Sequence, residues 1–273
     1  APAWAAPAQA RRCRAQQPSA PAQHKVAPVP TPPPASRPGD DPAFAEAWAR
    51  ADLIGGWLTQ AQGRLLWDSA RALSEGDRIV EIGSHQGRST VVLGLAAASV
   101  GARVTAIDPF VEGAMFGGQS TRTRFEANIA DAGLSDVVEL LAMKSQAALV
   151  GWRRPIDLLY IDGKHDYWTV VDDLGWTEHL EPGALTLIHD SFCSVGVTSA
   201  LLDQVLVRGR LRYLRRETTM AVFDGVAPTS QDRRRLAAEL PWFTRNVTIK
   251  AARRVHATPV LRALGHDSPY DPY

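Results

Sequence analysis

Cysteine is scarce in this chain: only Cys13 and Cys193 occur among its 273 residues. Two cysteines cannot build a disulfide framework, and they argue against a zinc site with cysteine ligands. The chain also lacks an apolar run of the roughly 20 residues that a membrane-spanning helix needs. Its early residues lack the compact apolar core of a secretory signal. We therefore expect a cytoplasmic protein.

An excess of charge of either sign is also missing. The 30 Lys and Arg residues nearly balance the 29 Asp and Glu residues, which gives a net charge of +1. The whole chain therefore shows no electrostatic preference for nucleic acid. Apolar residues make up 45 % and charged residues 22 %, a composition typical of a soluble globular protein.

Proline is concentrated at one end. Residues 1–43 hold eleven of the nineteen prolines, separated mainly by Ala and Gln. Such a stretch buries too little apolar surface to offset the entropy of ordering, so we predict a disordered tail. Beyond it we expect N-terminal helices over residues 44–76, an α/β domain over 77–226 and a basic helical extension with a tail over 227–273.

Strands and helices alternate through the predicted α/β domain. Apolar runs predict strands at residues 78–82, 103–107, 137–141, 157–161, 184–188, 211–215 and 220–223. Helical patterns lie at residues 88–100, 121–132, 167–179 and 195–207. Short connections of this kind indicate βαβ units in a doubly wound parallel sheet, with the last two strands antiparallel to each other. Ligands of such sheets bind beyond the carboxyl ends of the strands.

A glycine turn follows the first strand, in the sequence EIGSHQG at residues 81–87. Its spacing, Gly83-x-x-x-Gly87, differs from the Gly-x-Gly-x-x-Gly of dinucleotide binders and from a Walker loop. The helix start behind it offers free N–H groups to a carboxylate or phosphate. The turn is typical of a nucleotide-cofactor site, although an ordinary strand-to-helix turn can look the same.

An acid, Asp108, ends the second strand about 20 residues beyond the glycine turn. At that distance an acid can hydrogen-bond ribose hydroxyls. The alternative is an exposed acid that caps a turn before Pro109. The glycine turn and the strand order favour the ribose role.

Two later strands end in acids and histidines. Asp162 and His165 follow the fourth strand, and His189 and Asp190 follow the fifth. Paired carboxylates with open water positions suit Mg²⁺, and a histidine suits a general base for a hydroxyl. Alternatively, His165 only begins a helix and His189 is only an internally bonded histidine.

Together these motifs resemble the class I S-adenosylmethionine-dependent methyltransferases. The similarity is closest to a branch of bacterial small-molecule O-methyltransferases from natural-product and sugar pathways. It extends over residues 56–224, roughly three-fifths of the chain. The residues that carry it are Gly56–Thr59, Val80–Thr90, Asp108–Phe110, Tyr160–Tyr167, Asp172–Leu174, Leu180–Gly183, His189 and Asp190. The resemblance implies a Rossmann-like seven-stranded sheet of order 3-2-1-4-5-7-6 with the last strand antiparallel.

The resemblance also implies roles for single residues. The residues implied to hold the methionine part of the donor are Glu81, Gly83, Ser84 and Gly87, with Ser89 near its carboxylate. Asp108 would bind the ribose, and Ser145 would border the adenine. His165 maps to the catalytic base, and Asp162 is implied both in catalysis and beside the cofactor. The Mg²⁺ ligands map to Asp162, His189 and Asp190; several relatives carry an acid where this chain has His189, a ligand that Mg²⁺ seldom selects.

The implied activity is O-methylation of a hydroxyl on a small molecule, a sugar or natural-product intermediate of bacterial secondary metabolism. The acceptor pocket would come from the N-terminal helices and residues 111–122. Alternatives are a nucleic-acid or protein methyltransferase, and a catalytically silent module that binds S-adenosylmethionine.

The basic segment 232–265 suggests a packed helix with a solvated face, or a weak contact with a membrane surface. Formation of a homo-oligomer is left open.

Overall fold

The computed structural model describes residues 41–113, 117–268 and 271. The predicted tail therefore lies almost wholly outside the described residues, and its disorder stays a prediction. The first helix, α1 (Pro42–Ala51), begins two residues earlier than expected. Asp41 explains this start, because its side chain accepts hydrogen bonds from Ala43 N and Phe44 N and Pro42 occupies the first turn.

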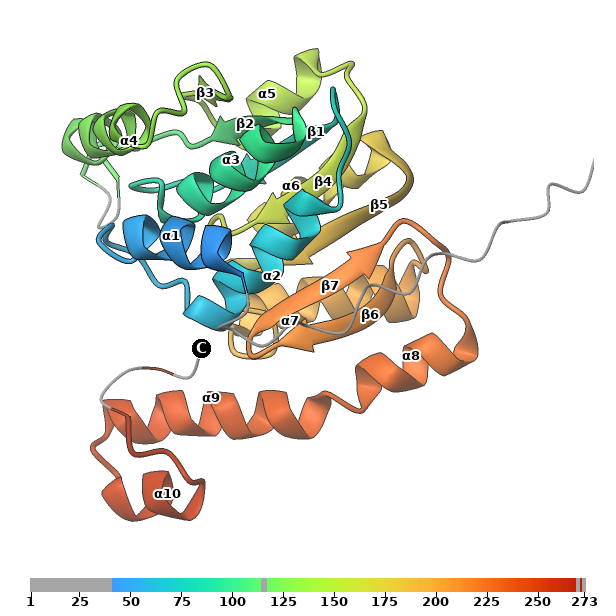
Figure 1. Ribbon diagram of the computed structural model, residues 1–273. Coiled ribbons are helices and arrows are strands. Elements are labelled where there is room, and N and C mark those ends of the chain that lie inside the picture. Colours follow the sequence, from blue (N-terminus) through green and yellow to red (C-terminus); the bar gives the residue numbers. More distant parts are fainter. Residues whose placement is uncertain (1–40, 114–116, 269–270, 272–273) are drawn as a thin grey trace, which may run out of the picture. The chain divides into compact units, whose positions relative to one another are not determined.

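Seven strands form one sheet of order β3-β2-β1-β4-β5-β7-β6 (Figure 1). The strands are β1 (Arg78–Ile82), β2 (Arg103–Ile107), β3 (Val138–Leu141), β4 (Ile156–Ile161), β5 (Leu180–Ile188), β6 (Arg212–Glu217) and β7 (Met220–Asp224). The first five pair in parallel, whereas β7 runs antiparallel to both β5 and β6. The predicted fold class, strand order and antiparallel last strand are confirmed.

Each face of the sheet has its own apolar core. One core contains Ile79 and Leu158 and is covered by α1, α2 (Gln60–Arg71), α3 (Arg88–Val100) and α4 (Gln119–Asp131). The other contains Val80 and Leu159. It is covered by α5 (Ser145–Gly151), α6 (Tyr167–Asp173), the 3₁₀ turn η1 (Leu174–His179), α7 (Val195–Leu202) and the π turn η2 (Asp203–Val207). Neighbouring strand residues therefore point to opposite faces, as the pleat requires.

The sequence patterns misplaced three boundaries on the second face. The helix predicted over 167–179 changes to 3₁₀ geometry at Leu174, and the helix predicted over 195–207 ends in a π turn. The strand β5 starts at Leu180 and includes Pro182 and Gly183, which were expected to precede it. The pairing of β5 with β4 is irregular at this point. A strand can hold proline and glycine at such an irregularity because no regular ladder bond is lost.

A row of four isoleucines aligns the strand ends that carry the motifs. Ile107, Ile82, Ile161 and Ile188 are register partners across β2, β1, β4 and β5. The residues that follow these isoleucines are, in the same order, Asp108, Gly83, Asp162 and His189. These four residues therefore lie side by side at the carboxyl ends of the strands. Their backbone N–H groups continue the ladder, for example from Asp162 N to Ile82 O at 2.8 Å and from His189 N to Ile161 O at 2.9 Å.

Three helices follow the sheet: α8 (Ser230–Ala237), α9 (Leu240–Arg254) and α10 (Thr258–Ala263). Leu236 of α8 is fully buried in the second core. In α9, Asn246 is fully buried and donates from Nδ2 to Phe192 O at 3.0 Å. Helices α8 and α9 of the basic segment thus pack against the domain, whereas α10 buries no residue, and a contact with a membrane surface stays a prediction. No helix among the described residues is long and apolar enough to cross a membrane.

We predict that alanine at Gly83 is far more damaging than alanine at Gly76. Both glycines have φ near +90°, where an L-residue is strained by about 1–2 kcal/mol. A Cβ at Gly83 would lie 2.2 Å from Asp162 O, whereas a Cβ at Gly76 would meet nothing within 4 Å. Chemical denaturation of Gly83→Ala and Gly76→Ala would separate the two costs. Equal losses of unfolding free energy would contradict the close approach of β1 and β4.

Candidate functional site

A hollow of about 300 Å³, counting its open mouth, lies at the glycine turn. Its lining residues are Gly55, Gly56, Trp57, Leu58, Gly83, Ser84, His85, Arg88, Ser89 and Asp162. Four of the predicted donor-binding residues are therefore gathered around one cavity. Gly87 lies behind it as the N-cap of α3, with φ +91° and Phe125 close to its Cα. Its task is to turn the chain into the helix.

Glu81 does not face this hollow. It is fully buried, and its two oxygens accept hydrogen bonds from Ser89 Oγ and Thr90 Oγ1, each at 2.5 Å. The predicted contact of Glu81 with the donor stays a prediction. Because Ser89 and Thr90 are the second and third residues of α3, Glu81 instead fixes the start of that helix under the cavity.

Asp108 lies beside the turn and orders it. Its Oδ2 accepts from His85 N at 2.9 Å, and its Oδ1 accepts from Phe110 N at 2.8 Å. Ribose binding by Asp108 stays a prediction. His85, which the sequence reasoning passed over, lines the hollow with φ +47° and lies 5.6 Å from the Trp57 ring.

Ser145, the residue expected beside the adenine, begins α5 and is 7 % exposed. Its hydroxyl donates to Asp173 Oδ1 on α6. Burial raises the pKa of Asp173 to about 7 despite this hydrogen bond. The observed role of Ser145 is thus to join α5 to α6, and its contact with the adenine stays a prediction.

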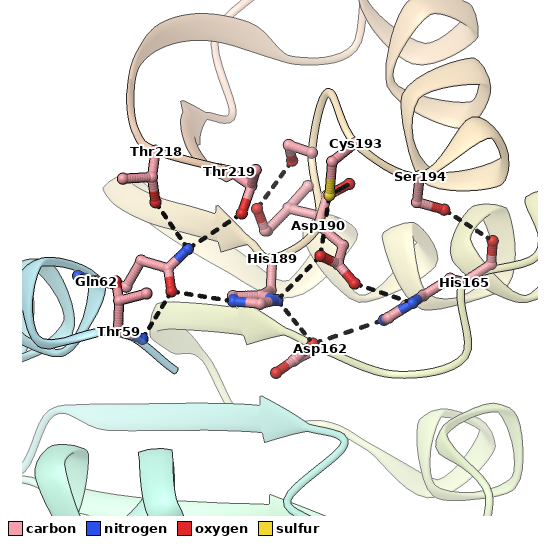
Figure 2. Close-up of polar contacts among 12 residues, drawn as sticks. Thr59, Gln62, Asp162, His165, His189, Asp190, Cys193, Ser194, Thr218 and Thr219 are labelled. Atoms are coloured by element: carbon pink, nitrogen blue, oxygen red, sulfur yellow. Dashed lines mark hydrogen bonds and ion pairs between the residues drawn. The ribbon is translucent and has the colours of Figure 1, made fainter. Parts of the chain in front are cut away.

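Four side chains beyond β4 and β5 form what we call the carboxylate–histidine network (Figure 2): Asp162, His165, His189 and Asp190. His189 Nδ1 lies 3.3 Å from Asp162 Oδ1 and 3.7 Å from Asp190 Oδ1. His165 Nδ1 lies 3.0 Å from Asp190 Oδ2, and its Nε2 lies 3.7 Å from Asp162 Oδ1. Two histidines therefore bridge the same two carboxylates.

Local backbone features place this network. Asp190 has φ +53°, which ends the strand alternation directly after His189. Tyr160, two residues before Asp162 on β4, donates from its hydroxyl to Asp162 Oδ2 at 3.1 Å. Gly196 lets α7 approach the loop of His165, because a Cβ there would lie 2.2 Å from His165 O. The network is thus built on strand ends and held by neighbouring helices.

Electrostatics favour charged groups in the network. Burial opposes ionisation of Asp162, but His189 and His165 outweigh it and hold the pKa of Asp162 well below its usual range. Burial likewise opposes a charge on His189, but Asp162 and Asp190 raise the pKa of His189 to about 9. The same two carboxylates raise the pKa of His165 against the effect of burial.

Gln62, on α2, is a member of the site that sequence reasoning missed. Its Oε1 lies 3.2 Å from His189 Nε2 and accepts from Thr59 N at 3.0 Å. Its Nε2 donates to Thr218 Oγ1 at 3.0 Å and Thr219 Oγ1 at 3.2 Å, in the β6–β7 turn. The only signal in the sequence is the helix-capping pattern of Thr59 and Gln62, which predicts a helix start and not a partner 127 residues away.

The C-terminal helix α9 also reaches the network. Cys193 donates from Sγ to Asp190 Oδ1 at 3.0 Å, and the charge of Lys250 on α9 acts on both Cys193 and His189. Asn246 holds the neighbouring Phe192 carbonyl. The extension that sequence reasoning treated as an appendage therefore closes one side of the site.

The predicted magnesium ligands Asp162, His189 and Asp190 come together at the strand ends. His189 Nδ1 is buried without a hydrogen-bond partner and faces both carboxylates, whereas its Nε2 faces Gln62 Oε1. Within residues 41–113 and 117–268, no three His, Cys, Asp or Glu side chains form a group that could hold a metal ion. The three residues form ion pairs with one another here, and magnesium binding by them stays a prediction.

Comparison with known proteins agrees with this geometry. Residues 80–191 match the family model of a methyltransferase domain. The chain carries a methyltransferase domain. The predicted enzyme class is thereby confirmed. The matched stretch contains the glycine turn and all four members of the carboxylate–histidine network.

Solved structures show the same fold as this methyltransferase domain. Cofactor-bound Rv0187 from MTB is 23 % identical with a TM-score of 0.51, covering 68 % of this chain and 91 % of that one. PaMTH1 from Podospora anserina, bound to SAH, is 17 % identical with a TM-score of 0.53, covering 68 % and 88 %. A Klebsiella pneumoniae protein assigned to the O-methyltransferases is 18 % identical with a TM-score of 0.52, covering 68 % and 91 %. This is the class I fold of S-adenosylmethionine-dependent methyltransferases.

We predict that Glu81 makes the domain less stable as the pH rises. Burial raises the pKa of Glu81 from 4.5 to about 7. Between these values the unfolded chain loses the proton while the folded chain keeps it, so stability is full below pH 4.5 and falls toward pH 7. The loss is of order 3 kcal/mol.

The measurement is urea denaturation across that pH window, compared between the wild type and Glu81→Gln. The difference between the two proteins removes the separate contribution of Asp173. A parallel pH dependence in both proteins would show that Glu81 is already ionised in the fold.

Proposed function

We propose that this chain transfers a methyl group from S-adenosylmethionine to a hydroxyl of a small-molecule acceptor. One observation carries the proposal: Asp162 lines the hollow at the glycine turn and also belongs to the carboxylate–histidine network. This supports a donor pocket that lies next to a proton-accepting group. A methyltransferase of hydroxyl groups needs these two parts in contact.

The hollow has the features that S-adenosylmethionine requires. Gly83 and Ser84 present a backbone turn without bulky side chains, and Ser89 lies at the positive end of α3, where a carboxylate is favoured. Asp108, at the end of β2, would bind the ribose. The bound sulfonium would supply an activated methyl group. Solved relatives that hold a cofactor or SAH in this fold support the assignment.

His165 is the group best placed to take the acceptor's proton. Its side chain is 44 % exposed, unlike that of His189, which is 2 % exposed. Asp162 and Asp190 raise the pKa of His165 against the effect of burial, which favours a proton on its ring. Nδ1 of His165 faces Asp190, so this carboxylate orients the ring as a positioning residue.

A small acceptor agrees with the way the hollow is covered. Arg88 donates to Ile54 O at 3.1 Å and to Asp52 at 2.6 Å, which ties the segment before Leu58 across the start of α3. Trp57 of that segment is 46 % exposed and offers an aromatic surface beside the cavity. The K. pneumoniae relative supports oxygen as the methylated atom. A sugar or natural-product intermediate is the acceptor class we propose.

We predict that Asp108→Asn weakens the binding of S-adenosylmethionine roughly 10- to 100-fold. The substitution keeps the shape but removes the charge, and hydrogen bonds to charged groups contribute about 1.5–3 kcal/mol. Isothermal titration calorimetry with S-adenosylmethionine measures the change. Asp131→Asn, at an exposed acid near the end of α4, is the matched control and should bind as the wild type. Unchanged affinity for both variants would remove the ribose role from Asp108.

We predict that His165→Ala lowers turnover by roughly 10²–10⁴-fold, the usual contribution of a general base. Binding of S-adenosylmethionine should stay intact, because His165 does not line the hollow. Transfer of a labelled methyl group to a panel of sugar and phenolic hydroxyl compounds gives the rate, and calorimetry gives the affinity. Lys164→Ala changes the exposed neighbour and serves as control. Unaltered turnover in His165→Ala would refute the base assignment.

A further inference from the structure

Arg88 brings a fixed positive charge to the hollow at the glycine turn. Among the described residues that line this hollow, Arg88 is the one arginine or lysine side chain. It is the first residue of α3, directly before Ser89, and its side chain is 16 % exposed. Because a guanidinium stays protonated in proteins, this charge is present at every pH at which the domain is folded.

Protein groups use only part of the Arg88 side chain. Its Nη1 donates to Ile54 O at 3.1 Å, and its Nη2 donates to Asp52 Oδ1 at 2.6 Å. A guanidinium has five N–H hydrogens, so two contacts leave three of them. One of these three is on Nε, which is buried and has no hydrogen-bond partner among the described residues. The side chain therefore has donors left for a ligand.

The positive charge of Arg88 is also only partly compensated. Asp52, its ion-pair partner, is 59 % exposed, so water screens the attraction between the two side chains. The ring of Trp48 lies 5.0 Å from Arg88 Cζ and attracts the cation without neutralising it. An anionic group that enters the hollow would therefore find an arginine whose charge is still available.

We infer that Arg88 binds the carboxylate of the methyl donor and thereby determines which way the donor lies in the hollow. The inference deepens the proposed function and rests on it, because it assigns one group of S-adenosylmethionine to one side chain. Hydrogen bonds between a guanidinium and a carboxylate are charge-assisted and are among the strong ones in proteins. Arg88 is thus a residue that distinguishes the complete donor from a nucleoside without its carboxylate.

The two charged groups of the lining come from different elements. Arg88 begins α3, whereas Asp162 follows β4. With its carboxylate at Arg88, the donor turns its sulfonium toward Asp162 and the carboxylate–histidine network, to which the proposed base His165 belongs. The reverse orientation would bring the donor's carboxylate to Asp162, where two acids repel each other. The charges of the hollow therefore direct the methyl group toward the acceptor side.

The alternative role of Arg88 is structural. Its contacts with Asp52 and Ile54 O tie the segment before Trp57 to α3. Gly56 permits this approach, because a Cβ there would lie 3.3 Å from Arg88 Cδ. A side chain that only ties the segment would affect every ligand of the hollow alike. A side chain that binds a carboxylate would affect only the ligands that carry one.

The test compares S-adenosylmethionine with decarboxylated S-adenosylmethionine, which has the same sulfonium and adenosine but no carboxylate. Isothermal titration calorimetry gives the affinity of each ligand for the whole chain and for Arg88→Gln. The wild type should prefer S-adenosylmethionine. Arg88→Gln should weaken binding of S-adenosylmethionine roughly 10- to 100-fold and leave binding of the decarboxylated ligand unchanged. Equal losses for both ligands would assign Arg88 to the tie alone and overturn the inference.

Asp52→Asn is the matched control. It removes the ion pair of the tie but keeps the guanidinium, so this variant should still prefer S-adenosylmethionine over the decarboxylated ligand. A loss of preference in Asp52→Asn as large as that in Arg88→Gln would overturn the inference, because the ion pair with Asp52 would then be what matters for binding.

A second measurement uses the folded wild type, in case Arg88→Gln does not fold. Arginine Nε–H groups give their own signals in ¹H–¹⁵N spectra, and the signal of Arg88 is assigned by its loss in Arg88→Lys, which keeps the positive charge. This signal should shift when S-adenosylmethionine is added and stay in place with the decarboxylated ligand. The same response to both ligands would overturn the inference.

The proposed function and the role of Arg88 fail in different ways. If the wild type binds neither ligand, the proposed donor is wrong and the assignment to Arg88 falls with it. If the wild type binds both ligands equally well, the donor site remains and the inference about Arg88 is overturned. A preference for S-adenosylmethionine that Arg88→Gln abolishes and Asp52→Asn keeps supports both.

Discussion

The alignment of four strand ends is the constraint on which the site depends. Ile107, Ile82, Ile161 and Ile188 lie in one row of the sheet, buried in the same core. The next residue on each strand must therefore point to the opposite face, toward α2 and α3. A shift of one residue in any strand would turn its motif away from the others. The apolar core that fixes the strand register therefore also determines which side chains meet at the site.

Contacts across the chain then convert this row into a working site. Gln62 on α2 connects the end of β5 with the β6–β7 turn, and α9 holds the loop that follows Asp190. Neither contact belongs to the strands themselves. Both act on His189 and its surroundings, where burial would otherwise make a charge costly. Asp162 and Asp190 compensate that cost, and Gln62 Oε1 faces Nε2, the other ring nitrogen of His189.

Much of this arrangement could be predicted from the sequence, because it depends on local patterns. Apolar runs that end in Gly83, Asp108, Asp162 and His189 identified the strand ends, and the alternation of elements identified the sheet. The predicted strand at 78–82 agrees with β1 residue for residue. The site residues at strand ends follow from the rule that parallel strands present their carboxyl ends at one edge.

Other features could not be predicted, because they depend on partners far away in the sequence. The local sequence around Gln62 predicts only a helix cap. The fold brings its side chain to His189. The hydrogen bonds of Glu81 with Ser89 and Thr90 could not be predicted either, because they depend on how α3 packs on β1. The short helix α5 carries too few turns for a periodic signal. His189 was placed correctly as a strand-end residue, but its charge depends on both sides of its ring being known.

The position of Asn246 has a consequence for where the functional unit ends. Residues 80–191 carry the family domain, the donor turn and both acids. A fragment cut at those limits would lose Gln62 upstream and Asn246 downstream. The Nε2 of His189 and the carbonyl of Phe192 would then both lose their protein partners. The boundary of the matched family domain is therefore narrower than the boundary of the machinery, which extends from α2 to α9.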